Sequence, residues 1–292
     1  MEQAVLEKYQ KNEEEAEISF LEDGRKITNI GNKAFLSCKS VKKLILADSV
    51  KKVGDWAFAH MQNLEILVLP CHEIVFGKKV FLDCEKLQQI QVRGDESGNP
   101  GMPWFLAAAV RILKNEGLCR PGEAGSAAMH REWIKEYDKA LMYFLGENDE
   151  EGFEPVFIGW FHVEDTDEQI PRYVKKRRQE KAELVFLRLL YPDYLEEALK
   201  EKLYLYLREH MTEESKSSED MSVLSIICDS GLEYGKDIRY MKILEKAGCL
   251  TMETTALLLE KMQDAPPEIT AFLLRKEGEF RQGADYFSEF EL

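Results

Sequence analysis

A repeat with a fixed period of 23 residues constrains the fold of this chain more than any other feature of its sequence. Three consecutive segments read ITNIGNKAFLSCKSVKKLILADS, VKKVGDWAFAHMQNLEILVLPCH and EIVFGKKVFLDCEKLQQIQVRGD, and together they span residues 27–95. Stacked without gaps, they share seven columns of matched residue type, including a glycine column (Gly31, Gly54, Gly77) and a phenylalanine column (Phe35, Phe58, Phe81). One such unit cannot bury its apolar face alone, so the repeat predicts coils that stack into a solenoid.

The columns also predict the conformation of each coil. The Val/Leu-x-x-Leu-x-Leu stretch of each segment places its last two apolar side chains two positions apart, on one face of a short strand. The glycine column marks a tight turn where a side chain would obstruct the stack. The phenylalanine column supplies a large ring that fills the interior between neighbouring coils. Period and spacing together are those of a leucine-rich repeat.

The segments IGNKAFLSCKSVKKLIL and VGDWAFAHMQNLEILVLP resemble the BspA-like class of leucine-rich repeats, whose pattern is IGxxAFxxCxxLxxIxLP. The resemblance covers residues 27–95 and extends back to residue 18 in a degenerate coil, where Ile18 and Phe20 are expected to point inward. It implies a curved solenoid that binds other proteins or surfaces, in a class that is common in bacteria and often secreted.

The expected fold class is α+β, with a short leucine-rich-repeat solenoid of three to four coils followed by an all-α helical domain. We expect residues 1–17 to form a helical cap, residues 18–96 the solenoid and residues 103–292 the helical domain. After the loop GDESGNPGMP the strand-like spacing of apolar residues disappears. Within 235–280 the strings YMKILEKAG and EITAFLLRKEG each place a leucine shortly before a glycine, which is similar to the outer helix of ankyrin-type helical pairs.

The net charge of −15 is unevenly distributed along the chain. Residues 1–100 hold 14 basic and 16 acidic side chains, whereas residues 101–292 hold 25 and 38. Because phosphate binding depends on clustered positive charge, this balance argues against a nucleic-acid partner. No apolar stretch approaches the roughly 20 residues of a membrane-spanning helix, and the N-terminus lacks the basic and apolar regions of a signal peptide. We therefore expect a cytoplasmic protein without a nucleic-acid or membrane partner.

The outward positions of the repeat strands carry the candidate binding site. A solvated strand face is normally polar, but three of these positions form an apolar patch. Such a patch marks either a partner surface or a surface that the chain's own helices cover, and the sequence leaves both readings open. The patch comprises Ile45, Ile66 and Val68, and its flanking outward positions are Lys43, Gln89 and Gln91.

Trp56 is a secondary candidate for the same role. Its repeat column otherwise holds Lys33 and Lys79, so a large aromatic side chain stands where charge is usual. This predicts a partner contact on that edge of the solenoid. The alternative is packing against the N-terminal helix or the helical domain.

The sequence contains no motif for catalysis, for a cofactor or for a metal. HExxH, the P-loop, GxGxxG and GxSxG are all absent from it. Cys38 and Cys84 share a repeat column with Met61, which favours a compact apolar interior position over redox or metal chemistry. Cys71 and His72 are adjacent, but no further ligand follows at a zinc-like spacing.

One dense basic run interrupts the acidic second half of the chain. Contact with RNA or with an acidic partner is one interpretation of it. A solvated helix face, paired with Glu180 and Glu183 or docked on other acidic neighbours, is the favoured one. The run consists of Lys175, Lys176, Arg177, Arg178 and Lys181.

These observations favour a non-catalytic module that binds a protein partner through the strand face. One alternative is a helical domain with an enzymatic or nucleotide-responsive role that the repeats only target. That role requires a polar pocket among the helices, with candidates such as His130, His162, Glu164 and Asp165. The other alternative is a structural unit that self-associates through the solenoid.

Overall fold

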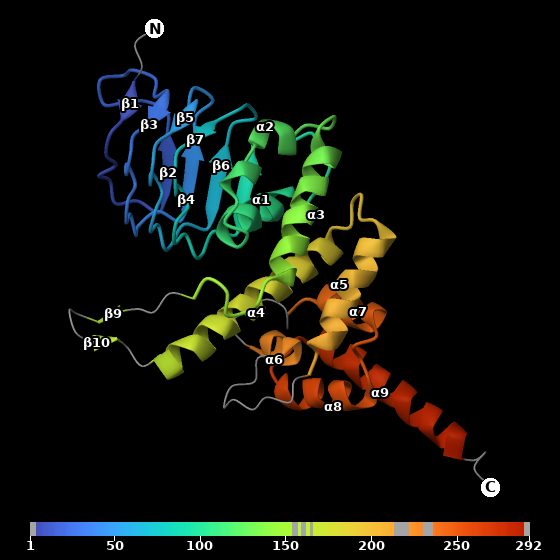
Figure 1. Cartoon of the computed structure of the whole chain (residues 1–292). Coiled ribbons are helices and arrows are strands. Elements are labelled where there is room, and N and C mark those ends of the chain that lie inside the picture. Colours follow the sequence, from blue (N-terminus) through green and yellow to red (C-terminus); the bar gives the residue numbers. More distant parts are fainter. Residues whose placement is uncertain are drawn as a thin grey trace. The chain divides into compact units, whose positions relative to one another are not determined.

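The computed structural model describes residues 4–153, 157–158, 162–163, 166–212, 222–229 and 236–288. The chain divides into two compact units, Met1–Gly146 and Glu147–Leu292 (Figure 1). Among the described residues, unit 1 contains the solenoid, three α-helices and the short 3-10 helix Glu116–Leu118, and unit 2 contains the remaining helices and a pair of short strands. The solenoid followed by helices has the α+β architecture that the repeat predicts.

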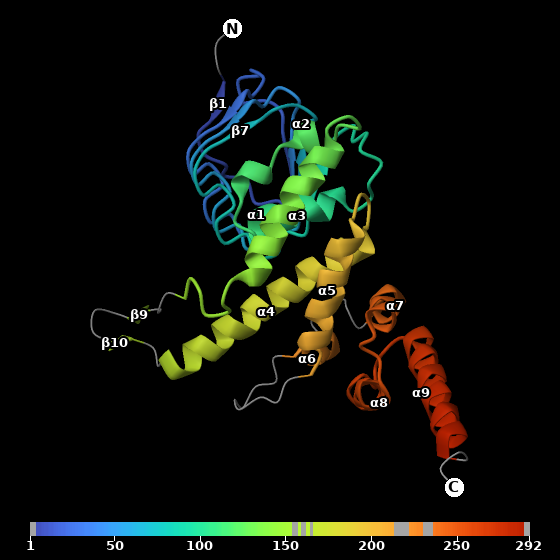
Figure 2. The same cartoon turned by 45° about the vertical axis from the view of Figure 1, so that its right-hand side comes forward.

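Two parallel sheets form the solenoid. The long-strand sheet has the order β2 (Glu15–Ile18), β4 (Lys43–Leu46), β6 (Ile66–Leu69) and β8 (Gln89–Val92). The short-strand sheet has the order β1 (Val5–Leu6), β3 (Asn29–Ile30), β5 (Lys52–Val53) and β7 (Val75–Phe76). Equivalent residues of successive coils pair directly, as Leu44 does with Leu67 and Leu67 with Ile90, so the coils stack in register (Figure 2).

The phenylalanine column forms a continuous ladder inside the solenoid. The ring of Phe35 lies 5.7 Å from that of Phe58, which lies 5.9 Å from Phe81. Tyr9 stacks on Phe35 at 4.7 Å and extends the ladder into the first coil. The three phenylalanines are buried, as expected for rings that fill the interior between coils.

The glycine column is required by the close approach of neighbouring backbones. A Cβ atom on Gly54 would lie 2.7 Å from the backbone nitrogen of Asn32, and one on Gly77 would lie 2.6 Å from that of Asp55. Neither glycine has a positive φ, so steric space, and not a left-handed conformation, selects glycine here.

The first coil differs from the prediction in two ways. Residues 4–17 hold strands β1 and the start of β2, so the helical cap expected over 1–17 is wrong for the described residues. The inward pair of β2 is Ala16 and Ile18, whereas Phe20 is 60% exposed. The cause is a tight turn after β2, which carries Phe20 away from the sheet. In this turn the N–H of Leu21 donates to the carbonyl of Arg25, and Phe20 forms an antiparallel bridge with Lys26.

Helices α1 (Met102–Arg111) and α3 (His130–Gly146) belong to unit 1. Helix α1 packs on β8 on one side, and on the other side the ring of its Phe105 lies 5.0 Å from the ring of Tyr137 in α3, so α1 is buried from both sides. The short α2 (Pro121–Ala124) packs on α3. The predicted helical domain of 103–292 is therefore divided, because its first helices close the C-terminal end of the solenoid.

In its described residues, unit 2 is helical apart from the antiparallel pair β9 (Phe157–Ile158) and β10 (His162–Val163). Its long helix α4 (Thr166–Leu190) packs on α5 (Glu197–Glu209), α6 (Val223–Cys228) and α7 (Ile238–Ala247). The pair α8 (Met252–Lys261) and α9 (Pro267–Ser288) lies side by side (Figures 1 and 2).

The two strings that suggested ankyrin-type pairs end differently. Gly248 terminates α7 with a φ of 74°, as a C-terminal glycine does. In the second string, α9 continues through Gly278 to Ser288, so Gly278 does not end a helix there. The resemblance between the two strings therefore does not produce two equivalent helical units.

Candidate functional site

The strand face, defined as the outward side chains of the long-strand sheet, is the candidate site. In β4, β6 and β8 the residues alternate between half-buried and buried, with Leu44, Leu67 and Ile90 fully inside. The outward residues of these strands are the six predicted ones: Lys43, Ile45, Ile66, Val68, Gln89 and Gln91. Since a one-residue slip would turn all of them inward, the repeat period determines their placement.

The strand register arranges this face in two rows. The pairings align Glu15, Lys43, Ile66 and Gln89 in one row and Glu17, Ile45, Val68 and Gln91 in the other. Ile66 and Val68 flank Leu67 on β6, and Ile45 pairs with Val68. The three apolar side chains are thus contiguous at the centre of the face, as predicted.

An ion pair forms the border of the strand face at the C-terminal ends of its strands. Arg93 follows β8 and donates from Nη1 to a carboxylate oxygen of Asp48 at 2.8 Å and from Nη2 to the carbonyl of Leu46 at 3.0 Å. These contacts join the end of β8 to the end of β4, across β6. The neighbouring His72 also binds the carbonyl of Asp48, at 3.1 Å.

Trp56 does not belong to the strand face. It lies in the turn after β5, which is a strand of the other sheet. Its ring is half-buried, and the Nζ atom of Lys79 from the next coil lies 5.2 Å from the ring centroid. The expected contact on that edge is therefore made at least partly within the repeat, by the next coil.

The C-terminal end of the solenoid depends on a residue that the sequence pattern did not indicate. In the inner coils, the backbone N–H groups of Trp56 and Phe58 donate to carbonyls of the next coil. In the last coil, the equivalent N–H groups of Lys79 and Phe81 donate to the carboxylate of Glu116, at 3.1 and 3.4 Å. The carboxylate of Glu116 thus accepts the two hydrogen bonds that a further coil would accept, although Glu116 lies 37 residues after Lys79 and 35 after Phe81 in the sequence.

The cysteines of the repeat occupy the predicted structural positions. Cys84 is buried and donates to the carbonyl of Phe58 at 3.1 Å, and burial raises the pKa of its thiol to about 12. Met61 is buried in the same column, while Cys38 is half-buried. All six cysteines are free thiols. Among the described residues, no group of three or more His, Cys, Asp or Glu side chains is placed to hold a metal ion.

The basic run of α4 docks on acidic residues just upstream of it. Arg177 pairs with Glu147, and Arg178 pairs with Asp149 at 2.7 Å. The buried Lys181 binds a carboxylate oxygen of Asp149 at 2.7 Å and the carbonyl of Glu147 at 2.6 Å. The basic run therefore holds residues 147–149, at the start of unit 2, against α4, as expected for docking on acidic neighbours.

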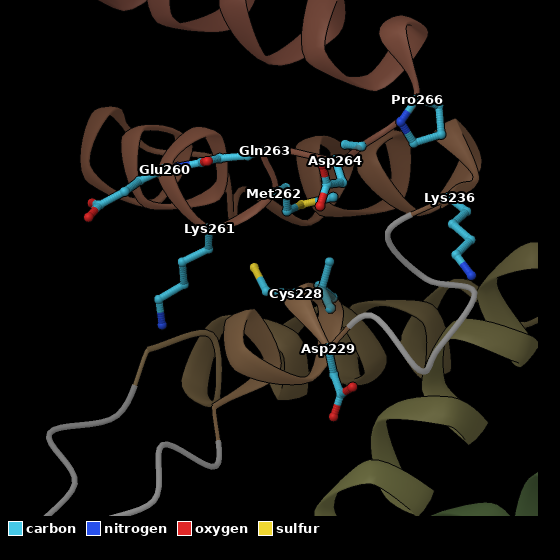
Figure 3. A pocket seen from close by; sticks show the side chains of 11 residues that line it. Cys228, Asp229, Lys236, Glu260, Lys261, Met262, Gln263, Asp264 and Pro266 are labelled. Atoms are coloured by element: carbon cyan, nitrogen blue, oxygen red, sulfur yellow. The ribbon is translucent and has the colours of Figure 1, made fainter.

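Unit 2 has a pocket of about 360 Å³ between α6 and the end of α8. Its lining includes Cys228, Asp229, Lys236 and Lys261 (Figure 3). The two lysines lie at opposite sides of the pocket and Asp229 points away from α8, so these groups do not converge on one ligand (Figure 3).

Of the candidates for a catalytic pocket, His130 does not line this one. His130 is buried in α3 of unit 1, where its Nε2 lies 3.3 Å from the amide nitrogen of Asn99. His162 is in β10 of unit 2, but its side chain lies outside the described residues, as do Glu164 and Asp165.

The comparison with known families agrees with the repeat geometry. Residues 11–97 match the family described as BspA type leucine rich repeat region, with six copies. This segment of unit 1 is therefore similar to leucine-rich repeats of the BspA type, which generally mediate protein–protein interaction and are typically non-enzymatic. No curated protein and no solved structure matches the chain. Within the described residues, no helix is both long and apolar enough to cross a membrane.

Proposed function

We propose that the protein is a non-catalytic interaction module that binds a protein partner through the strand face. The apolar patch of Ile45, Ile66 and Val68 forms the centre of the site, with Lys43, Gln89 and Gln91 beside it. The observation that carries this proposal is the contiguity of three apolar side chains on the solvent side of a sheet whose other side is the core. Contiguous apolar surface of this kind marks interaction sites in soluble proteins.

The ends of the solenoid support a binding role more than self-assembly through the sheet edges. Helix α1 covers β8 at one end. At the other end, the edge strand β2 carries the exposed Glu15 and Glu17, directly after Glu13 and Glu14. Charged side chains on an edge strand oppose pairing with a second copy of the same strand.

The decisive variant replaces Ile66 and Val68 by Lys. Because both side chains point outward, Ile66→Lys/Val68→Lys is expected to abolish capture of the partner while changing the unfolding temperature little. Val75→Lys is the matched control, since Val75 is an apolar side chain on the other sheet and is 57% exposed. Capture is measured by quantitative mass spectrometry of proteins retained by the full chain and by both variants.

Two outcomes would contradict the proposal. The double variant would retain the same proteins as the wild type if the strand face were not the site. It would instead unfold at a much lower temperature than Val75→Lys if the patch were internal. Light scattering of the wild type tests the alternative of self-association, which requires an oligomer at high protein concentration.

A further inference from the structure

The strand face differs in chemistry between its two edges. Strand β2 contributes the carboxylates Glu15 and Glu17 at one edge. The apolar patch occupies β4 and β6, beside Lys43 of β4, which pairs with Glu15. Strand β8 contributes the amides Gln89 and Gln91 at the other edge. A partner that lies across the strands therefore meets negative charge at only one of its ends.

The negative charge at the β2 edge is only partly neutralised. Lys43 pairs with Glu15 at 2.8 Å and Lys42 pairs with Glu14 at 3.1 Å. Glu17 accepts a hydrogen bond from the neutral hydroxyl of Ser19 at 3.1 Å, and within the described part of the chain it has no cationic partner. Glu17 is exposed, so its carboxylate is available to a cation of a partner.

The opposite edge offers neutral hydrogen-bonding groups. The Nε2 atom of Gln91 donates to the Oε1 atom of Gln89 at 2.9 Å, which holds the two amides together. This arrangement leaves the amino group of Gln89 and the carbonyl oxygen of Gln91 for a partner. Both groups suit polar, uncharged side chains.

We propose that the partner element is an amphipathic helix that carries Lys or Arg at the end lying over β2. This proposal rests on the binding role of the strand face. The outward side chains offer too few hydrogen-bonding groups to satisfy an extended backbone, whereas a helix satisfies its own. Its cationic end pairs with Glu17, and its apolar side chains cover Ile45, Ile66 and Val68.

The dimensions of the sheet give the spacing within that helix. Neighbouring strands lie about 4.8 Å apart, so β2 and β6 are separated by about 10 Å. A helix rises about 1.5 Å per residue, so a Lys or Arg over Glu17 lies about seven residues from the side chain over Val68. Residues seven apart lie on the same face of a helix, which makes this pattern recognisable in a peptide sequence.

A peptide library tests the proposal without a known partner. The probe is a displayed library of helical peptides with randomised positions on one face, selected against the full-length chain. Peptides enriched by the wild type are expected to share an apolar cluster with Lys or Arg about seven residues away. In Glu17→Gln, their affinity is expected to fall about threefold at low salt, and this difference should shrink as salt is added.

The control variants separate the two proposals. Glu73→Gln removes an exposed carboxylate outside the strand face and is expected to leave affinity unchanged. Enriched peptides that need Ile66 and Val68 but show no preference for Lys or Arg would overturn the inference and leave the proposed function intact. If selection yields no peptide that depends on Ile66 and Val68, the proposed function fails, and the inference fails with it.

Discussion

At the scale of single residues, Gly54 tests how closely the coils are stacked. A Cβ atom at this position would lie 2.7 Å from the Asn32 nitrogen and 2.8 Å from the Gly31 carbonyl carbon, both of which are backbone atoms that cannot turn aside. Gly54→Ala is therefore expected to destabilise unit 1 by about 2–3 kcal/mol, as overpacking does. Urea unfolding measures the change. Gly146→Ala is the control, because a Cβ there meets nothing within 4 Å and stability should be unchanged or slightly higher.

Asp149 gives a residue-scale prediction with a defined pH dependence. Burial alone would raise the pKa of its carboxyl, but hydrogen bonds from Lys181 and Arg178 outweigh burial and hold the pKa below its usual range. The stabilisation from Asp149 is thus fully present above the unfolded-state pKa of about 3.9 and is lost as the pH falls through the lower folded-state pKa. Asp149→Asn is expected to lower the stability of unit 2 at pH 7 by about 2 kcal/mol or more.

Measuring the stability of wild type and Asp149→Asn over a range of pH distinguishes the contribution of the ionised Asp149 carboxylate from a general effect of losing one negative charge. The stability difference between wild type and Asp149→Asn should narrow below pH 4, because the carboxyl of the unfolded chain then takes up a proton while the native carboxyl, whose pKa is lower, stays ionised. Glu150→Gln removes the same charge from an exposed neighbour and is expected to have little effect at any pH. A difference that stays constant down to pH 2 would exclude the ionised carboxylate as the cause.

At the scale of elements, Glu116 determines whether the last coil is closed. Its carboxylate accepts the N–H groups of Lys79 and Phe81 that have no following coil to bind. Glu116→Ala is expected to destabilise unit 1 by about 1–3 kcal/mol, since it leaves these donors unpaired. Glu116→Gln keeps one acceptor oxygen and should therefore destabilise unit 1 less than Glu116→Ala does. Glu132→Ala, which removes an exposed carboxylate that pairs with Lys135, is the control in thermal unfolding. An equal effect of both alanine variants would contradict the capping role.

The elements that follow the repeat pattern could be predicted from the sequence, and those that interrupt it could not. The strand face was predictable because the 23-residue period fixes which side chains point outward. The first coil was not predictable, because Tyr9 stands in place of phenylalanine and Ala16 in place of leucine, and neither lies 23 residues before its counterpart in the next coil. The repeat itself implies that the module after it covers its C-terminal end, but the sequence does not show that α1 does so, since burial on both sides makes α1 resemble any apolar helix.

At the scale of the whole molecule, the structure predicts where the chain can be divided. The sequence suggested an end of the solenoid at residue 96, but α1 packs on β8 and α3 packs on α1, which completes unit 1 at Gly146. Residues 1–146 expressed alone are expected to unfold cooperatively with native-like circular dichroism. Residues 1–97 expressed alone are expected to aggregate, because the surface that α1 covers on β8 becomes exposed. Cooperative unfolding of the shorter chain would show that α1 is dispensable.

The division also assigns the net charge to one part of the molecule. Residues 1–146 hold 21 acidic and 20 basic side chains, whereas residues 147–292 hold 33 and 19. Repulsion within unit 2 therefore opposes its folding, and salt screens exposed charges more than the buried contacts of Asp149 and Lys181. Raising the salt from 20 to about 300 mM is expected to stabilise unit 2 by about 1 kcal/mol, or roughly 3 °C in its unfolding midpoint. The midpoint of unit 1 should shift much less, and calorimetry of the full chain compares the two. Equal shifts would mean that a general effect of salt on apolar burial, and not charge repulsion, dominates.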